Sequence, residues 1–210
     1  MKNCLYPLLV LALLPGCSRT GFSADGGVYA TRSVCPLVGV PAGTGDVTLF
    51  DPAGRADSGA IDVTASITNV RASCDDSGAD VISTASFDVI AIRRAPGPAR
   101  QVVLPYFNTV VQGGSDIVAK RVGAVAVNFA DGAVRGQSSG QATARVSRSA
   151  ATLPDNVRRI LSEERKAGDP SAAVDPLTDP AVREAVARAT FEQLVGFQLS
   201  QDQLRYNVTR

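Results

Sequence analysis

Short runs of alternating apolar and polar residues fill the middle of the chain, and this period of two constrains the fold more than any other feature. In residues 61–68 every second residue is Ile, Val or Ala, and the residues between them are Asp, Thr or Ser. Such alternation is typical of a strand with one buried face and one wet face. Further strand-like runs follow, with no helical pattern between them, at 81–92, 100–111, 117–129 and 133–147. We therefore predict a mainly β fold over residues 28–148, an antiparallel β-sandwich that is immunoglobulin-like or similar, with a barrel as the alternative.

Three local signals refine this prediction. In residues 81–92 both faces carry apolar side chains, which predicts an interior strand that is covered on both sides. Pro105 lies inside the 100–111 run, where it predicts an edge strand, a bulge or a break. Asp131-Gly132 predicts a hairpin between the last two runs. The chain contains no Trp, which disfavours an antibody-type immunoglobulin domain, because such domains are built around a core Trp.

From residue 149 the pattern changes to that of helices. Pro154 stands at a first helical position, and Gly168 is a stop signal for that helix. Asp179 is the expected N-cap of a second helix, with Pro180 at its first position. We therefore predict that residues 149–210 form a helical extension, packed on or beside the sandwich.

Large apolar residues surround the end of the second predicted helix. In its first turns the apolar residues lie on one face of the helix, whereas near its end they are spread over several sides. One interpretation is a helix end packed under a loop, and the other is a docking surface for a partner protein. The residues of this possible partner surface are Phe191, Leu194, Val195 and Phe197.

The first sixteen residues have the composition of an export signal. Lys2 precedes an apolar run over residues 8–14, which is too short for a bilayer span of about 20 helical residues. The run ends in Leu14-Pro15-Gly16-Cys17, and the whole segment resembles the signal peptide and lipobox of bacterial lipoproteins. The resemblance implies cleavage after residue 16 and acylation of Cys17, and two or more acyl chains make a stable membrane anchor.

The residue after Cys17 bears on the membrane that the protein reaches. In the lipoproteins, Asp at this position tends to retain the protein in the inner membrane, whereas this chain has Ser18. The resemblance therefore implies the periplasmic side of the outer membrane. Residues 17–27 are predicted to be the lipidated cysteine and a flexible tether, because Ser, Gly, Asp and Thr dominate them. The resemblance covers only the signal, and the remaining chain resembles no characterised family.

Two cysteines remain after the signal and the lipid site are set aside. Cys35 and Cys74 form an even pair in a chain that carries an export signal, so we predict a disulfide between them. Closure of a loop of that size stabilises a fold by roughly 3 to 4 kcal/mol in the chain-entropy model. A metal site is disfavoured, because there is no CxxC spacing and the chain contains no His.

Charge excludes one class of partner. The full chain has 21 basic and 20 acidic residues, and removal of residues 1–16 takes away only Lys2, which leaves 20 of each. A neutral chain of this kind has no electrostatic attraction to nucleic acid. The sequence also predicts no metal ion and no cofactor.

Two motifs could carry chemistry, and neither fits its context. Residues 136–140 match the G-x-S-x-G spacing of a nucleophile elbow, but they fall inside an alternating run, and no His is present to act as a base. We therefore interpret them as part of a strand. Residues 75–80 carry three Asp, yet they lack the ligand spacing of a calcium loop, so we predict a solvated turn.

Two functions from different classes remain open. The first is a non-catalytic envelope lipoprotein that is anchored in the membrane by its lipid and binds an envelope protein or a polymer. The second is a periplasmic hydrolase that uses a pair of carboxylates about 5 to 9.5 Å apart in a cleft. The acids considered for that pair are Asp57, Asp62, Asp88 and Asp131.

Overall fold

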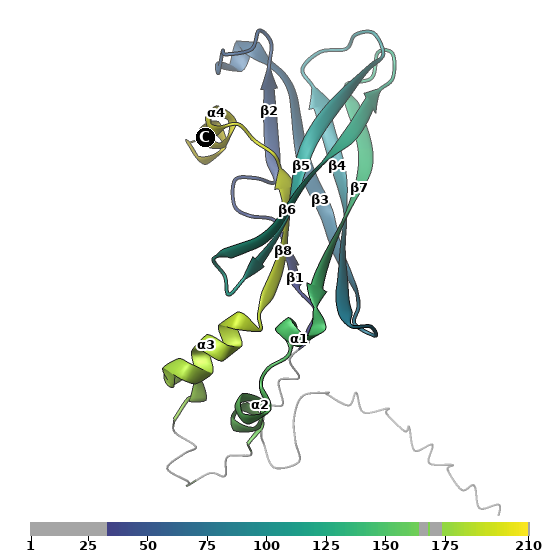
Figure 1. Ribbon diagram of the computed structural model, residues 1–210. Coiled ribbons are helices and arrows are strands. Elements are labelled where there is room, and N and C mark those ends of the chain that lie inside the picture. Colours follow the sequence, from purple (N-terminus) through teal and green to yellow (C-terminus); the bar gives the residue numbers. More distant parts are fainter. Residues whose placement is uncertain (1–32, 164–167, 169–173, 210) are drawn as a thin grey trace, which may run out of the picture.

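Two four-stranded sheets face each other in the computed structural model, which describes residues 33–163, 168 and 174–209 (Figure 1). The first, called the β8 sheet here, has the order β1 (Leu37–Gly39), β8 (Phe191–Phe197), β5 (Arg100–Gln112), β6 (Asp116–Phe129). The second, called the β4 sheet, has the order β2 (Asp46–Phe50), β3 (Ile61–Asp75), β4 (Asp80–Arg93), β7 (Arg135–Ser147). Neighbouring strands are antiparallel except β1 and β8, which are parallel. The predicted β-sandwich is confirmed.

The helices are short and lie outside the sandwich (Figure 1). They are α1 (Arg148–Ala151), α2 (Asp155–Ser162), α3 (Pro180–Arg188) and α4 (Gln201–Thr209), with 3-10 turns at Ser58–Ala60 and Pro176–Thr178. Asp179 caps α3 as predicted, since its side chain accepts a hydrogen bond from the amide of Ala181 and Pro180 follows it. α2 ends at Ser162, short of the stop predicted at Gly168.

The interior contains two apolar clusters with a polar layer between them. The larger cluster includes Phe87, Phe129 and Phe197, and the smaller one includes Val110 and Phe191. In β5 and β8 the inward positions between the clusters are Asn108 and Gln193, both buried. Gln193 donates to Asn108 and to the carbonyl of Ala142 at 3.0 Å each, and Asn108 donates to the carbonyl of Thr143 at 3.0 Å. These bonds join the two sheets through the interior and satisfy the Gln193 amide nitrogen and both polar atoms of the Asn108 side chain, while the Oε1 atom of Gln193 is buried without a partner among the described residues.

Two glycines make room for aromatic rings at the centre of the larger cluster. A Cβ at Gly140 would overlap the ring of Phe87, and one at Gly123 would lie 2.6 Å from the ring of Tyr106. The two rings meet edge to face, with centroids 5.2 Å apart. Close packing of the rings therefore requires glycine at both strand positions.

Strands 81–92 and 100–111 differ in detail from their predictions. β4 is interior to its sheet, as predicted, but only one of its faces is covered, because Ile92 on the other face is 48% exposed. β5 runs through Pro105 without a break. The carbonyl of Pro105 accepts a bond from the amide of Gln198 at 2.9 Å, and its missing N–H falls where the pairing with β8 ends, since that pairing begins at Tyr106.

The hairpin predicted at Asp131-Gly132 is wrong. The tight turn exists, with Gly132 at φ 70° and the amide of Ala133 bonded to the carbonyl of Ala130 at 3.1 Å. It joins β6 to β7, however, and these strands belong to different sheets. The chain therefore crosses the sandwich at this turn, because the local turn chemistry does not decide which strand becomes the neighbour.

The prediction of a helix end at residues 191–197 is also wrong, and with it the docking surface there. These residues form β8, an interior strand between β1 and β5. Phe191, Val195 and Phe197 are buried at 7%, 0% and 1% exposure, and Leu194 is partly buried. The predicted boundary at residue 148 fails for the same reason, because the segment after it supplies a core strand to the sandwich. Pairing with two strands outweighed the local pattern.

Candidate functional site

Three loops gather at the end of the sandwich opposite α1, α2 and α3 (Figure 1). They connect β2 to β3 (51–60), β4 to β5 (94–99) and β6 to β7 (130–134), and we call this the loop end. The opposite, helical end carries the three helices and the β3–β4 turn. β4 has 14 residues and runs from one end to the other, which separates them by about 44 Å.

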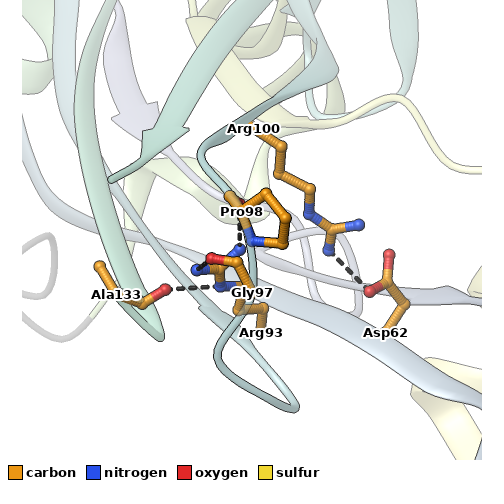
Figure 2. Close-up of polar contacts among 6 residues, drawn as sticks. All are labelled: Asp62, Arg93, Gly97, Pro98, Arg100 and Ala133. Carbon is orange, nitrogen blue, oxygen red and sulfur yellow. Dashed lines mark hydrogen bonds and ion pairs between the residues drawn. The ribbon is translucent and has the colours of Figure 1, made fainter. Parts of the chain in front are cut away.

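Arg93, the last residue of β4, is the centre of the loop end (Figure 2). It is only 4% exposed. Its guanidinium donates to the carbonyls of Pro98 at 2.8 Å, Gly97 at 2.6 Å and Ala130 at 3.3 Å, and its Nε donates to the carbonyl of Ala133. One side chain therefore binds two loops, 94–99 and 130–134.

No carboxylate contacts the Arg93 guanidinium among the residues described. Its charge is compensated instead by four carbonyl dipoles and by the ring of Phe129, whose centroid lies 5.4 Å from the guanidinium carbon. Backbone bonds tie the same segments together, from the Arg93 amide to the carbonyl of Val134 at 2.9 Å and from the Gly132 amide to the carbonyl of Gly97 at 3.0 Å. The two loops are thus held in one arrangement.

The third loop is attached through the neighbouring arginines. Arg100 forms an ion pair with Asp62 at 2.6 Å, which Figure 2 shows beside the Arg93 cluster. Arg94 donates from its side chain to the carbonyl of Gly59 and from its amide to the carbonyl of Asp62. These contacts connect loop 51–60 and the start of β3 to loop 94–99. The loop end is therefore one linked surface built from three distant segments.

Sequence reasoning missed Arg93, although a signal for it was present. The residues of β4 with odd numbers, such as Val89 and Ala91, face the core and are buried. Continuation of this alternation puts Arg93 on the core side and Arg94 on the outside. Which groups would compensate the buried charge could not be predicted, because the acceptors come from two separate loops.

Three of the four acids that could form a catalytic pair have polar contacts with other side chains. Asp62 pairs with Arg100, and Asp57 pairs with Arg55 at 2.7 Å. Asp131 lies exposed in the β6–β7 turn. Asp57 and Asp62 are therefore ion-pair partners of arginines at the loop end.

Asp88 lies on the solvent-facing side of the β4 sheet. It accepts hydrogen bonds from Asn69 at 2.7 Å and from Ser139 at 2.8 Å, and these two bonds, that of Asn69 foremost, lower the pKa of its carboxyl. Asn69 reaches it from an irregularity of β3, where its φ is 53°. Ser139 belongs to the G-x-S-x-G segment, which lies within β7 as predicted. Ser139 is the residue after the serine position of that motif, which is Ser138, and it donates a hydrogen bond to its strand neighbour Asp88.

The predicted disulfide between Cys35 and Cys74 is confirmed, with their Cα atoms 6.1 Å apart. It lies at the helical end, next to the β3–β4 turn. In that turn Asp75 accepts bonds from the amide and the hydroxyl of Ser77, at 3.0 and 2.7 Å, and these bonds lower the pKa of Asp75. No group of three or more metal-binding side chains occurs among the residues described, and the turn has the geometry of an ordinary Asx turn.

Cys17, the predicted lipid site, lies outside the described residues, as do the signal peptide and the tether. In the part of the chain that the structure covers, no helix is both long enough and apolar enough to cross a membrane. Comparison of the chain with protein-family models, with curated proteins and with solved structures gives no match.

Proposed function

We propose that this chain is a non-catalytic lipoprotein of the bacterial cell envelope, anchored through Cys17 in the outer membrane, which presents its loop end to an envelope protein on the periplasmic side. The motif Leu14-Pro15-Gly16-Cys17 supports the anchor. The observation that carries the binding role is the loop end itself, where one buried guanidinium fixes two loops through four carbonyls. Loops that are ordered before binding lose less entropy on binding.

The position of the N-terminus supports the same orientation. The described chain begins at Ser33, and two residues later Cys35 is bonded to Cys74 at the helical end. The tether predicted from the sequence covers residues 17–27, and a tether of that length has a reach of about 18 Å if it is flexible. An anchor at Cys17 therefore holds the helical end near the membrane and leaves the loop end about 44 Å farther out.

The anchor is tested by metabolic labelling with a fatty acid. The wild-type chain should incorporate the label and be cleaved after Gly16, whereas Cys17→Ala should remain unlabelled and uncleaved. Label in the Cys17→Ala variant would remove the lipid anchor from the proposal.

The binding role is tested by photo-crosslinking in intact cells, with matched positions at the two ends. Ala99 lies exposed in a loop of the loop end, and Ala79 lies exposed in the β3–β4 turn of the helical end. A photoreactive amino acid at Ala99 should give one discrete adduct with an envelope protein, and the same amino acid at Ala79 should not. A discrete adduct from Ala79 alone, or none from Ala99, would contradict the assignment of the loop end as the binding surface.

A further inference from the structure

The edge strands of the two sheets differ in how they are covered. Side chains of the β8 sheet bond two carbonyls of β7, Tyr106 to Gln141 at 2.8 Å and Asn108 to Thr143 at 3.0 Å. At β2, Asn207 of α4 bonds the carbonyl of Asp46 at 2.7 Å. β1 has only three residues. β6 is a long edge strand of 14 residues, and among the described elements only β5 pairs with it.

The free part of β6 is residues 116–122, which we call its lower half. Residues 116–122 are all exposed, including Ile117 at 67%, Val118 at 50% and Val122 at 60%. Near its end β6 is approached by β7, because Gly136 of β7 packs against Val127 and Asn128. An exposed apolar edge offers unpaired backbone groups to another strand.

Pro105 determines which backbone groups of β6 point outward. Its carbonyl accepts a bond from the amide of Gln198 at 2.9 Å, so Pro105 turns its polar backbone side toward β8. Ala124 lies opposite Pro105 in β6. In an antiparallel ladder two opposite residues that do not bond each other both point away, so Ala124 turns its N–H and C=O to the free edge.

The direction alternates from Ala124 along the strand. Val122 and Lys120 therefore also point outward. Next comes a bulge, because Val110 and Val111 of β5 pair with Ala119 and Ile117, which leaves Val118 as the extra residue. Ile117 lies opposite Val111 of β5. Val111, like Pro105, has an odd number and turns its backbone N–H and C=O groups toward β8, so Ile117 turns its own groups to the free edge.

A second copy of this edge fits the first in one symmetric antiparallel register. We place the two-fold axis at Ala119. Because Val118 is the extra residue of the bulge, Ile117 and Lys120 are then the two neighbours of the axis residue. The outward N–H and C=O groups of Ile117 meet those of Lys120 from the second copy, once on each side of the axis. Asp116 then lies directly opposite Arg121 of the second copy, again twice, at positions where cross-strand side chains come closest. An axis at Lys120 or at Arg121 would place like charges opposite each other. An axis at Val122 would extend the pairing toward the end of β6 that β7 approaches.

We propose that the lower half of β6 is a homodimer interface, in which two copies pair edge to edge about Ala119 through reciprocal Asp116–Arg121 ion pairs. The two β8 sheets then join into one continuous sheet. The exposed Ile117 and Val118 lie beside the axis, where a second copy shields them from water. The inference is independent of the lipid anchor and of the loop end.

Crosslinking of introduced cysteines tests the position of the axis. The full chain with Cys4→Ser and Cys17→Ser has no free thiol besides the introduced one, since Cys35 and Cys74 are bonded. Under mild oxidation Ala119→Cys should form a covalent dimer, because it faces itself across the axis. Ala124→Cys, exposed on the same strand but away from the axis, should stay monomeric.

Charge reversal tests the register by sedimentation equilibrium. Asp116→Arg and Arg121→Asp should each weaken the dimer by about tenfold or more, because each replaces two attractive pairs by two repulsive ones. The double reversal should restore the wild-type dissociation constant to within about threefold. Both side chains are exposed, so the fold should be unaffected.

Two outcomes would overturn the proposal. A wild-type chain that stays monomeric at all concentrations would mean that the bulge and the charges of β6 only protect the edge from pairing. A dimer that the double reversal fails to restore, or that Ala124→Cys traps as well as Ala119→Cys, would assign the interface to another register or another surface.

Discussion

The two ends of the sandwich are fixed by different chemistry. At the helical end a covalent bond, Cys35–Cys74, joins the start of the described chain to β3, and α1, α2 and α3 lie at the same end. At the loop end a buried cation, Arg93, holds two loops through their carbonyls. The disulfide depends on oxidation, whereas the arginine depends on the exclusion of water. Each end is therefore stabilised by its own interaction, and we expect that loss of one interaction destabilises one end and leaves the other folded.

The largest effect is expected from removal of the charge at the loop end. Arg93→Met keeps much of the side-chain volume but leaves four carbonyls without their donor, and it should lower the free energy of unfolding by about 3 to 5 kcal/mol. Arg145→Ala is the control, because its ion pair with Asp80 is a surface contact with the arginine side chain 71% exposed, and it should cost less than about 1 kcal/mol.

Hydrogen exchange decides whether the Arg93→Met effect is local. Amides in 94–99 and 130–134 should lose protection, while those near Cys74 should keep it. Equal loss of protection at both ends would show that Arg93 stabilises the whole sandwich and not the loop end alone.

Removal of the disulfide should have a slightly smaller effect at the opposite end. Cys35→Ala with Cys74→Ala opens a loop closed by residues 39 apart and should lower the free energy of unfolding by about 3 to 4 kcal/mol. Loss of protection should centre on β1, a strand of three residues next to the bond, and should spare loops 94–99 and 130–134. Denaturant unfolding with exchange detected by mass spectrometry measures both quantities. If the Arg93 loops open first in this variant, the two ends are coupled.

Acid should affect the ends unequally, and this is the smallest effect. Asp75 at the helical end has a folded-state pKa below its ordinary value of 3.8, so its hydrogen bonds to Ser77 stabilise the fold above that value and are lost as the pH falls through the lowered one. The acceptors that hold loops 94–99 and 130–134 are backbone carbonyls, not carboxylates. Below about pH 4 the turn at 75–80 should therefore lose protection before loops 94–99 and 130–134 do.

The acid prediction is checked by NMR titration of the Asp75 side chain and by the variant Asp75→Asn, which should remove the pH dependence of the turn. Asp88, whose pKa is lowered by Asn69 and Ser139, should titrate with the same sign. A folded-state pKa of Asp75 at or above that of the unfolded chain would contradict the prediction.

Features governed by adjacent residues could be predicted from the sequence. The strand over residues 61–68 follows from its alternation, the cap at Asp179 from the Asp-Pro pair, and the disulfide from an even pair of cysteines behind an export signal. The segment 191–197 could not be predicted, because its inward position 193 is Gln and its neighbour Leu194 is apolar, which conceals the period of two. This segment becomes a strand by pairing with β5, whose paired residues lie 79 to 91 positions earlier in the chain.

The sequence by itself determined that apolar strand faces must be buried against each other and that Cys35 and Cys74 would pair. The tertiary structure alone decided that Asp131-Gly132 crosses between sheets, that Arg93 finds its acceptors in two loops, and that β6 keeps a free edge. The physical reason is distance along the chain. Periodicity and capping depend on residues a few positions apart, whereas strand neighbours and the partners of a buried charge are chosen among segments that meet only after the two sheets have packed.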